Sequence, residues 1–252
     1  VTTITYTGSE IEKTITVSAF GVELRGVTVD NETDSTTIQV NSGSLKLRNT
    51  GIYESGGEFN HTALSIYGSA DLGTTVSESR GGTDPGENFF HLRFPGQFIT
   101  NFSANSILAL GNNFKIDHDD DAGFVSATGF DAELEIHHGI DNIAQGLVRY
   151  GSQMGGFDIG ALYVGAGSSS RLTNAIALHD ADDVILVEGG DYSPDAVALQ
   201  EGAVLGIPAG TTTINGAISG LGEITGRAID GTSEVTEGIV LTLGDGSNDG
   251  IN

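Results

Sequence analysis

Short apolar stretches alternate with turn-forming residues along the whole chain. Examples run from Thr3 to Thr7, from Lys13 to Val17 and from Val22 to Val29, with Gly8-Ser9 and Phe20-Gly21 between them. Alternation of apolar and polar residues predicts strands with one buried face. Long stretches with helical apolar spacing are missing, so we expect little helix anywhere.

Similar clusters continue to the end of the chain. Each is bounded by residues such as Gly, Asn, Asp and Ser, which favour turns. We expect a turn at Gly111-Asn112-Asn113 between two of these clusters. The further predicted strands lie near residues 45–47, 62–67, 107–110, 114–116, 134–136, 147–148, 161–164, 175–178, 184–187, 197–199, 203–207, 212–214, 222–224 and 240–243.

The stretch from Gly21 to Asp30 has the pattern of one rung of a solenoid: strand, turn at Gly26, strand. A second such unit runs from Gly43 to Tyr53, and a third begins at Thr62. Comparable points are roughly 20 residues apart, the size of a solenoid repeat. We therefore predict an all-β fold, a right-handed parallel β-helix or similar solenoid. A β-sandwich or jelly roll is the alternative, because strand lengths alone allow it.

We expect one elongated unit over residues 1–252, with a possible lateral loop insertion at 68–105. This segment contains a polar stretch and then a cluster of aromatic residues. Two interpretations of the cluster stay open: the rings stack in the core, or they form a subunit contact. Its five phenylalanines are Phe89, Phe90, Phe94, Phe98 and Phe102.

The end of the chain carries a recognisable repeat. Residues 216–220 read GAISG, residues 222–225 read GEIT, and residues 238–248 read GIVLTLGDGSN. In this order they resemble the passenger-associated repeat of bacterial autotransporters. The resemblance covers about 40 residues, and the linker at 226–237 is longer and more acidic than in that family. It implies a right-handed parallel β-helix on an exported surface protein.

The rung from Gly21 to Asp30 also resembles those of pectin-degrading β-helix enzymes and phage tailspikes. Polygalacturonase-type catalysis requires paired aspartates, a Gly-His-Gly and an Arg-x-Lys. Asp182-Asp183 provides a pair, but His138-Gly139 lacks a preceding glycine, and no Arg-x-Lys follows. The signature of these enzymes is therefore absent.

Composition narrows the range of partners. The chain has 34 acidic against 10 basic residues, for a net charge of −24. Such a surface repels nucleic-acid phosphates and anionic membranes, so we expect neither as a partner. No run of 18 apolar residues exists, so no membrane-spanning helix is expected. Without cysteine, disulfides and thiolate chemistry are excluded. Many carboxylates are available to divalent cations.

Two acidic turns are candidate Ca²⁺ sites, because carboxylates at alternate positions can converge on a hard cation. Residue 128, where an EF-hand that starts at Asp117 would have its closing glutamate, is a threonine. The second turn has Gly250 at its sixth place, and the chain ends before any closing acid. The alternative is a solvated acidic turn in each case. The candidate ligands are Asp117, Asp119 and Asp121 in the first turn, and Asp245, Ser247 and Asp249 in the second.

Two weaker candidates lie between residues 131 and 141. His137 and His138 are near several acids, but neighbours in a strand point to opposite faces, so both cannot bind one zinc ion without a bend. Glu133 and Glu135, expected on one strand face, could with Asp131 form a carboxylate pair for glycoside hydrolysis. The chain has no tryptophan to serve as a sugar platform.

These features favour a non-enzymatic structural or adhesive protein. We expect it on an extracellular surface filament, adhesin or virion appendage, with no catalytic residues and no cofactor apart from possible Ca²⁺. Neither end of the chain has a recognisable cap, so we expect self-association into a homo-oligomer or filament, with glycans as possible partners. The alternative is a carbohydrate-active β-helix enzyme, a polysaccharide lyase or hydrolase, with its site at 117–121 or 131–141.

Overall fold

The fold is taken from a computed structural model of the whole chain. It describes residues 2–6, 12–33, 35–54, 61–74, 84–93, 96–117, 123, 125–152, 161–181, 183–194, 196–208, 210–226 and 239–244. The chain divides into two compact units. The first comprises residues 1–138 and 144–159, and the second comprises 139–143 and 160–252. We expected a single elongated unit over residues 1–252. Whether the two units form one such body stays a prediction.

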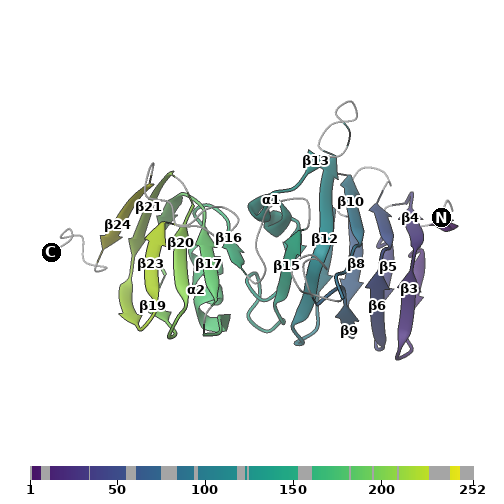
Figure 1. Cartoon of the computed structure of the whole chain (residues 1–252), viewed down its shortest axis with the longest axis horizontal. Coiled ribbons are helices and arrows are strands. Elements are labelled where there is room, and N and C mark those ends of the chain that lie inside the picture. Colours follow the sequence, from purple (N-terminus) through teal and green to yellow (C-terminus); the bar gives the residue numbers. More distant parts are fainter. Residues whose placement is uncertain are drawn as a thin grey trace. The chain divides into compact units, whose positions relative to one another are not determined.

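Three sheets build the first unit (Figure 1). Sheet one contains β1 (Thr2–Tyr6), β4 (Val27–Asn31), β7 (Gly51–Glu54), β10 (Phe89–Arg93) and β12 (Ile107–Asp117), with β13 (Val125–Ser126) and β15 (Val148–Ser152) also paired to β12. Sheet two contains β2 (Ile15–Val17), β5 (Ile38–Val40), β8 (His61–Ile66), β11 (Gly96–Asn101) and β14 (Ile136–His137). Sheet three contains β3 (Val22–Arg25), β6 (Ser44–Arg48) and β9 (Ser69–Asp71).

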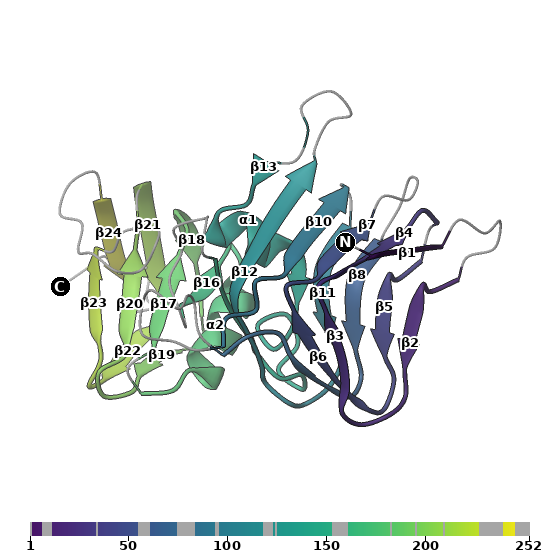
Figure 2. The ribbon, with the colours of Figure 1, turned by 45° about the vertical axis from the view of Figure 1, so that its right-hand side comes forward.

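The chain visits these sheets in a fixed order. It runs through β2, β3 and β4, then β5, β6 and β7, then β8, β9 and β10, so each three-strand repeat adds one strand to each sheet. Figure 2 shows β2, β5, β8 and β11 side by side. Among the described strands of this unit, every pair except β12 with β13 is parallel. The all-β prediction is confirmed. The parallel pairing disfavours the sandwich and jelly-roll alternatives, which use antiparallel sheets.

The corner between sheets three and one has the same backbone shape in successive repeats. Gly26, Asn49 and Glu87 stand there with φ of 66°, 50° and 51°. This left-handed region suits Gly and, next best, Asn. Gly111 has φ of 72° inside β12, which runs through the turn expected at 111–113. The chain bends where we expected, but the ladder pairing continues across the bend.

Apolar side chains stack in register inside the first unit. Val29 of β4 lies opposite Ile52 of β7, which lies opposite Phe90 of β10, and all three are 0% exposed. Burying such side chains stabilises the fold by about 1.5–3 kcal/mol each. Phe114 continues this row, with its ring stacked on Phe90 at a centroid distance of 5.2 Å.

The phenylalanine cluster is therefore mainly core. Phe90 and Phe98 are fully buried, Phe89 is half-buried, and Phe102 is 44% exposed. Phe94 lies outside the described residues. Three strands, β9, β10 and β11, lie inside the segment 68–105, where we expected a lateral loop.

The second unit repeats the scheme with shorter steps (Figure 2). Val184 pairs with Val204, which pairs with Glu223, in steps of 20 and 19 residues. All its described strand pairs are parallel. Its sheets contain β16 (Leu162–Val164), β17 (Val184–Val187), β20 (Val204–Ile207) and β23 (Glu223–Gly226); β18 (Gly190–Tyr192), β21 (Gly210–Asn215) and β24 (Ile239–Gly244); and β19 (Ala196–Leu199) and β22 (Ala217–Gly220).

Two helices among the described residues correct the strand prediction. The predicted strand at 175–178 is the end of α2 (Ser169–Leu178), and the one at 134–136 overlaps the end of α1 (Gly129–Leu134). The buried residues of α2, Leu172, Ala175 and Ile176, have the i, i+3, i+4 spacing of a helix face. That spacing outweighs the β propensity of single residues. Neither helix is long and apolar enough to cross a membrane.

Candidate functional site

The segment 128–138 contains several predicted site residues. Its first half forms the helix α1 and not the expected strand. Thr128 caps α1: its hydroxyl accepts from the Asp131 N–H at 3.2 Å, and the Asp131 carboxylate accepts from the Thr128 N–H at 2.9 Å. This capping box satisfies free N–H groups at the helix start. The prediction that Glu133 and Glu135 share a strand face is wrong, and Asp131 is engaged as a cap.

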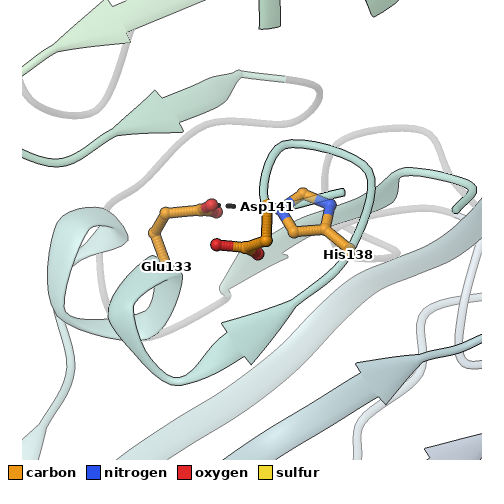
Figure 3. Close-up of side chains that lie close together, drawn as sticks. All are labelled: Glu133, His138 and Asp141. Atoms are coloured by element: carbon orange, nitrogen blue, oxygen red, sulfur yellow. Dashed lines mark hydrogen bonds and ion pairs between the residues drawn. The ribbon is translucent and has the colours of Figure 1, made fainter. Parts of the chain in front are cut away.

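Glu133 points from the buried face of α1 into a polar network. Its Oε1 lies 3.0 Å from His138 Nε2, and its Oε2 accepts from the Tyr150 hydroxyl at 2.7 Å. Figure 3 shows Glu133 and His138 with their side-chain tips facing each other. The side chains of Glu133 and His138 are both 1% exposed. Because this network is closed to solvent, its residues can brace the fold but cannot reach a substrate.

Hydrogen bonding fixes the proton on His138. Its Nδ1 accepts from the backbone N–H of Val148 at 2.8 Å, so that nitrogen carries no proton. The ring proton is therefore on Nε2, where it is donated to Glu133. A metal ion bound at Nε2 would take the place of this proton.

Zinc binding near His137 and His138 stays a prediction. His137, half-buried, and His138, fully buried, differ in exposure, as expected for neighbours in and just after a strand. Asp141, also drawn in Figure 3, belongs to the second unit, where its carboxylate lies 3.0 Å from Arg171 Nε. We therefore assign Glu133, His138 and Tyr150 to a structural brace between α1, β14 and β15.

The calcium prediction falls mostly outside the described residues. Asp117 ends β12, half-buried, opposite Arg93 in the ladder. The other five candidate ligands, Asp119, Asp121, Asp245, Ser247 and Asp249, are outside the described part of the chain. Calcium binding at both turns stays a prediction.

Sequence reasoning missed a charged clamp on sheet three. The guanidinium of Arg48, 2% exposed, binds Asp84 through two 2.7 Å hydrogen bonds and Asp71 Oδ1 through one more at 2.7 Å. Lys46 Nζ lies 3.3 Å from Asp84. The clamp thus contains two basic side chains, Arg48 and Lys46, and two acidic ones, Asp71 and Asp84. No sequence motif indicates the clamp, because Asp84 is 36 residues from Arg48.

The clamp shifts both partners toward their charged forms. Burial alone would lower the pKa of Arg48, but its hydrogen bonds to Asp84 and Asp71 outweigh this and raise its pKa. The hydrogen bond from Arg48 holds the pKa of Asp84 well below its usual value, against the opposing effect of desolvation and with help from Lys46. Arg48 and Asp84 therefore stay ionised at neutral pH.

Two further ionisable groups have altered acidity. Burial raises the pKa of Glu135, which follows the last turn of α1, to about 7. Burial, aided by the nearby charge of Lys115, lowers the pKa of His91 to about 4. His91 lies on the outer face of sheet one, with its ring centroid 4.3 Å from that of Tyr53. Near neutral pH, His91 is uncharged and Glu135 is partly protonated.

Comparisons of the chain with protein-family models, with curated proteins and with solved structures found no match. Its function is therefore inferred from its own residues and their geometry.

Proposed function

We propose that the chain is a right-handed parallel β-helix that serves as a non-enzymatic structural or adhesive part of an extracellular surface filament, adhesin or virion appendage. The observation that carries the proposal is the fixed visiting order of the three sheets, with parallel register kept from repeat to repeat. A chain that adds one strand to each sheet per repeat grows along one axis. Such growth suits a rod or a platform.

The polar clusters support a scaffold role, because they join neighbouring repeats. Arg48 of β6 binds Asp71, the last residue of β9 in the next repeat. Asn88 donates to the carbonyls of Leu47 and Leu72, and its N–H binds Asn112. These groups hold the stack in register at its corners.

Self-association is the expected mode of action. Among the described strands, β1 pairs only with β4 and stands at the end of sheet one. A free strand edge is a template for pairing with another chain. The excess negative charge makes nucleic acid and anionic membranes unsuitable partners.

Sedimentation velocity over a wide concentration range tests the proposal. The intact chain should form concentration-dependent oligomers, and its smallest species should sediment as an elongated particle. A variant without residues 1–7 should remain folded and lose most of the association. A compact monomer at every concentration, unchanged by this deletion, would refute the assembly.

One observation favours a second candidate, a carbohydrate-active enzyme. The pKa of Glu135 near 7 suits a general acid in glycosidic-bond cleavage. Activity should then appear in a screen of acidic polysaccharides and disappear in Glu135→Gln or in Asp119→Asn. Turnover that survives both substitutions, or no turnover at all, counts against this candidate.

A further inference from the structure

A small hollow opens at the corner between sheets three and one. Its volume is about 180 Å³, below the roughly 300–1,000 Å³ typical of sites for drug-sized ligands. The hollow can therefore hold one small unit of a larger ligand. It is lined by Gly26, Val27, Thr28, Asn49, Gly51, Tyr53 and Phe89, which we call the corner hollow.

Register explains the shape of the corner hollow. Gly51 of β7 stands between Thr28 of β4 and Phe89 of β10 in one row across sheet one. A Cβ at Gly51 would come within 2.8 Å of the Tyr53 ring and 3.2 Å of Thr28 Oγ1. The missing side chain thus lets the Tyr53 ring lie close over the sheet, with the half-buried Phe89 on the next strand.

The polar groups around the hollow are uncommitted to the protein. Within the described structure, the Thr28 hydroxyl, the Asn49 amide and the Tyr53 hydroxyl make no hydrogen bond to another protein group. Asn88 and Asn112 follow later in the chain at the same corner. Their side-chain amides donate hydrogen bonds to backbone carbonyls. In the corner hollow, by contrast, the amide of Asn49 and the hydroxyls of Thr28 and Tyr53 are available to a ligand.

Charge narrows the chemistry of that ligand. Among the described residues that line it, none is an aspartate, glutamate, lysine, arginine or histidine, although the chain has a net charge of −24. A second hollow, across sheet three, is bordered by Glu23, Lys46 and Asp71 and is thus charged. Among these described residues, an anionic ligand would meet no cation, and a cation would meet no carboxylate.

We propose that the corner hollow binds one ring of a neutral polysaccharide. A pyranose has apolar C–H faces, which pack against aromatic rings such as Tyr53 and Phe89. Its rim of hydroxyls both donates and accepts, as do the groups of Thr28, Asn49 and Tyr53. The inference deepens the adhesive role proposed above, and rests on it, by giving that role a ligand class.

Saturation-transfer NMR and calorimetry with soluble hexaoses provide the test. The probes are cello-, laminari-, manno- and xylohexaose, with hexagalacturonate as the acidic comparison. At least one neutral hexaose should bind in the millimolar range and more tightly than hexagalacturonate. No binding by any neutral hexaose, or tighter binding of hexagalacturonate, overturns the proposal.

Conservative variants locate the site. Asn49→Gly keeps the left-handed backbone and removes the amide, and Tyr53→Phe removes only a hydroxyl. Together they should weaken binding about tenfold, since each lost hydrogen bond has a modest effect. Gly51→Ala keeps every polar group but crowds the Tyr53 ring, and it should also weaken binding. The control, Tyr67→Phe, alters a tyrosine outside the hollow that is 50% exposed.

Unchanged affinity in the double variant, or an equal loss in Tyr67→Phe, overturns the assignment. Circular dichroism must show each variant folded, which these mild substitutions favour. Sedimentation of the same samples separates the two proposals. Failed sugar binding in a chain that still assembles refutes only the corner hollow, and sugar binding by a strict monomer refutes only the assembly.

Discussion

At the scale of single residues, two buried asparagines brace the ends of strands. Asn31 ends β4 and Asn101 ends β11, and both are 0% exposed. In each, Oδ1 accepts from the backbone N–H and the hydroxyl of the residue two places on, Thr33 or Ser103. The same spacing reads as an N-glycosylation sequon. Here it closes a local turn, and the amide nitrogens donate to backbone carbonyls, so they are not available to a glycan.

Replacing Asn101 tests this role. Asn101→Ala leaves the carbonyls of Asn105 and Gly146 without the amide donor. We expect the free energy of unfolding to fall by about 2–3 kcal/mol, since buried groups lose partners. Urea denaturation measures this change in the free energy of unfolding. The control is Asn49→Gly, at an exposed residue, which should change the free energy of unfolding little. Mass spectrometry of protein from a glycosylating host should find Asn31 and Asn101 unmodified, and a glycan at either would contradict the brace.

Glu135 makes stability depend on pH. Its pKa is about 7 in the folded chain and near 4.5 when exposed, so the folded state binds the proton more tightly. Its contribution is therefore favourable at low pH and is lost as pH rises from about 4.5 to 7. Glu135→Gln should raise the melting temperature at about pH 8, above both values, and leave it nearly unchanged at about pH 4. An equal effect at both pH values would contradict this.

At the scale of elements, the Arg48 clamp ties the segment that carries Asp84 to sheet three. Asp71 and Asp84 approach Arg48 from β9 and from the chain before β10. Removing one partner leaves the buried cation undercompensated. The clamp therefore fixes where the chain returns to sheet one.

Asp84→Asn tests the clamp by its pH dependence. The pKa of Asp84 is lowered on folding, so its stabilisation is present above its ordinary value of 3.8 and is lost as pH falls below it. The variant should melt below the wild type at neutral pH, and the gap should narrow below about pH 4. Asp191→Asn, at an exposed aspartate, is the control. A gap independent of pH would exclude the ion pair as its cause.

At the scale of the whole molecule, we expect the net charge to oppose association. Each copy has a net charge of −24, so two copies repel each other at close approach. Ions that screen the charge or bind to the carboxylates reduce this repulsion. We therefore predict that bound cations promote assembly as well as folding.

Calcium should raise the melting temperature relative to chelator at constant ionic strength. A ligand at roughly 100 times its dissociation constant stabilises the fold by about 2.7 kcal/mol. The combined substitutions Asp119→Asn, Asp121→Asn and Asp249→Asn should remove the effect. An unchanged melting temperature in the wild type would reduce both turns to solvated acidic loops.

The sequence by itself determined most of the strands, the turn at Gly26 and the spacing between the first repeats, where Val22 pairs with Leu45. These features are local, since alternation and turn residues act within a few positions. The helices also had local signals that we did not use: the cap from Thr128 to Asp131 and the spacing of Leu172, Ala175 and Ile176.

Only the tertiary structure decided which residues from distant parts of the chain become neighbours. Arg48 and Asp84, or Thr28, Gly51 and Phe89, are far apart along the chain and become neighbours because parallel register stacks successive repeats. Likewise, Glu133 joins a buried polar network because α1 turns its side chain inward to His138 and Tyr150. Register and burial depend on contacts between distant segments, which no local pattern specifies.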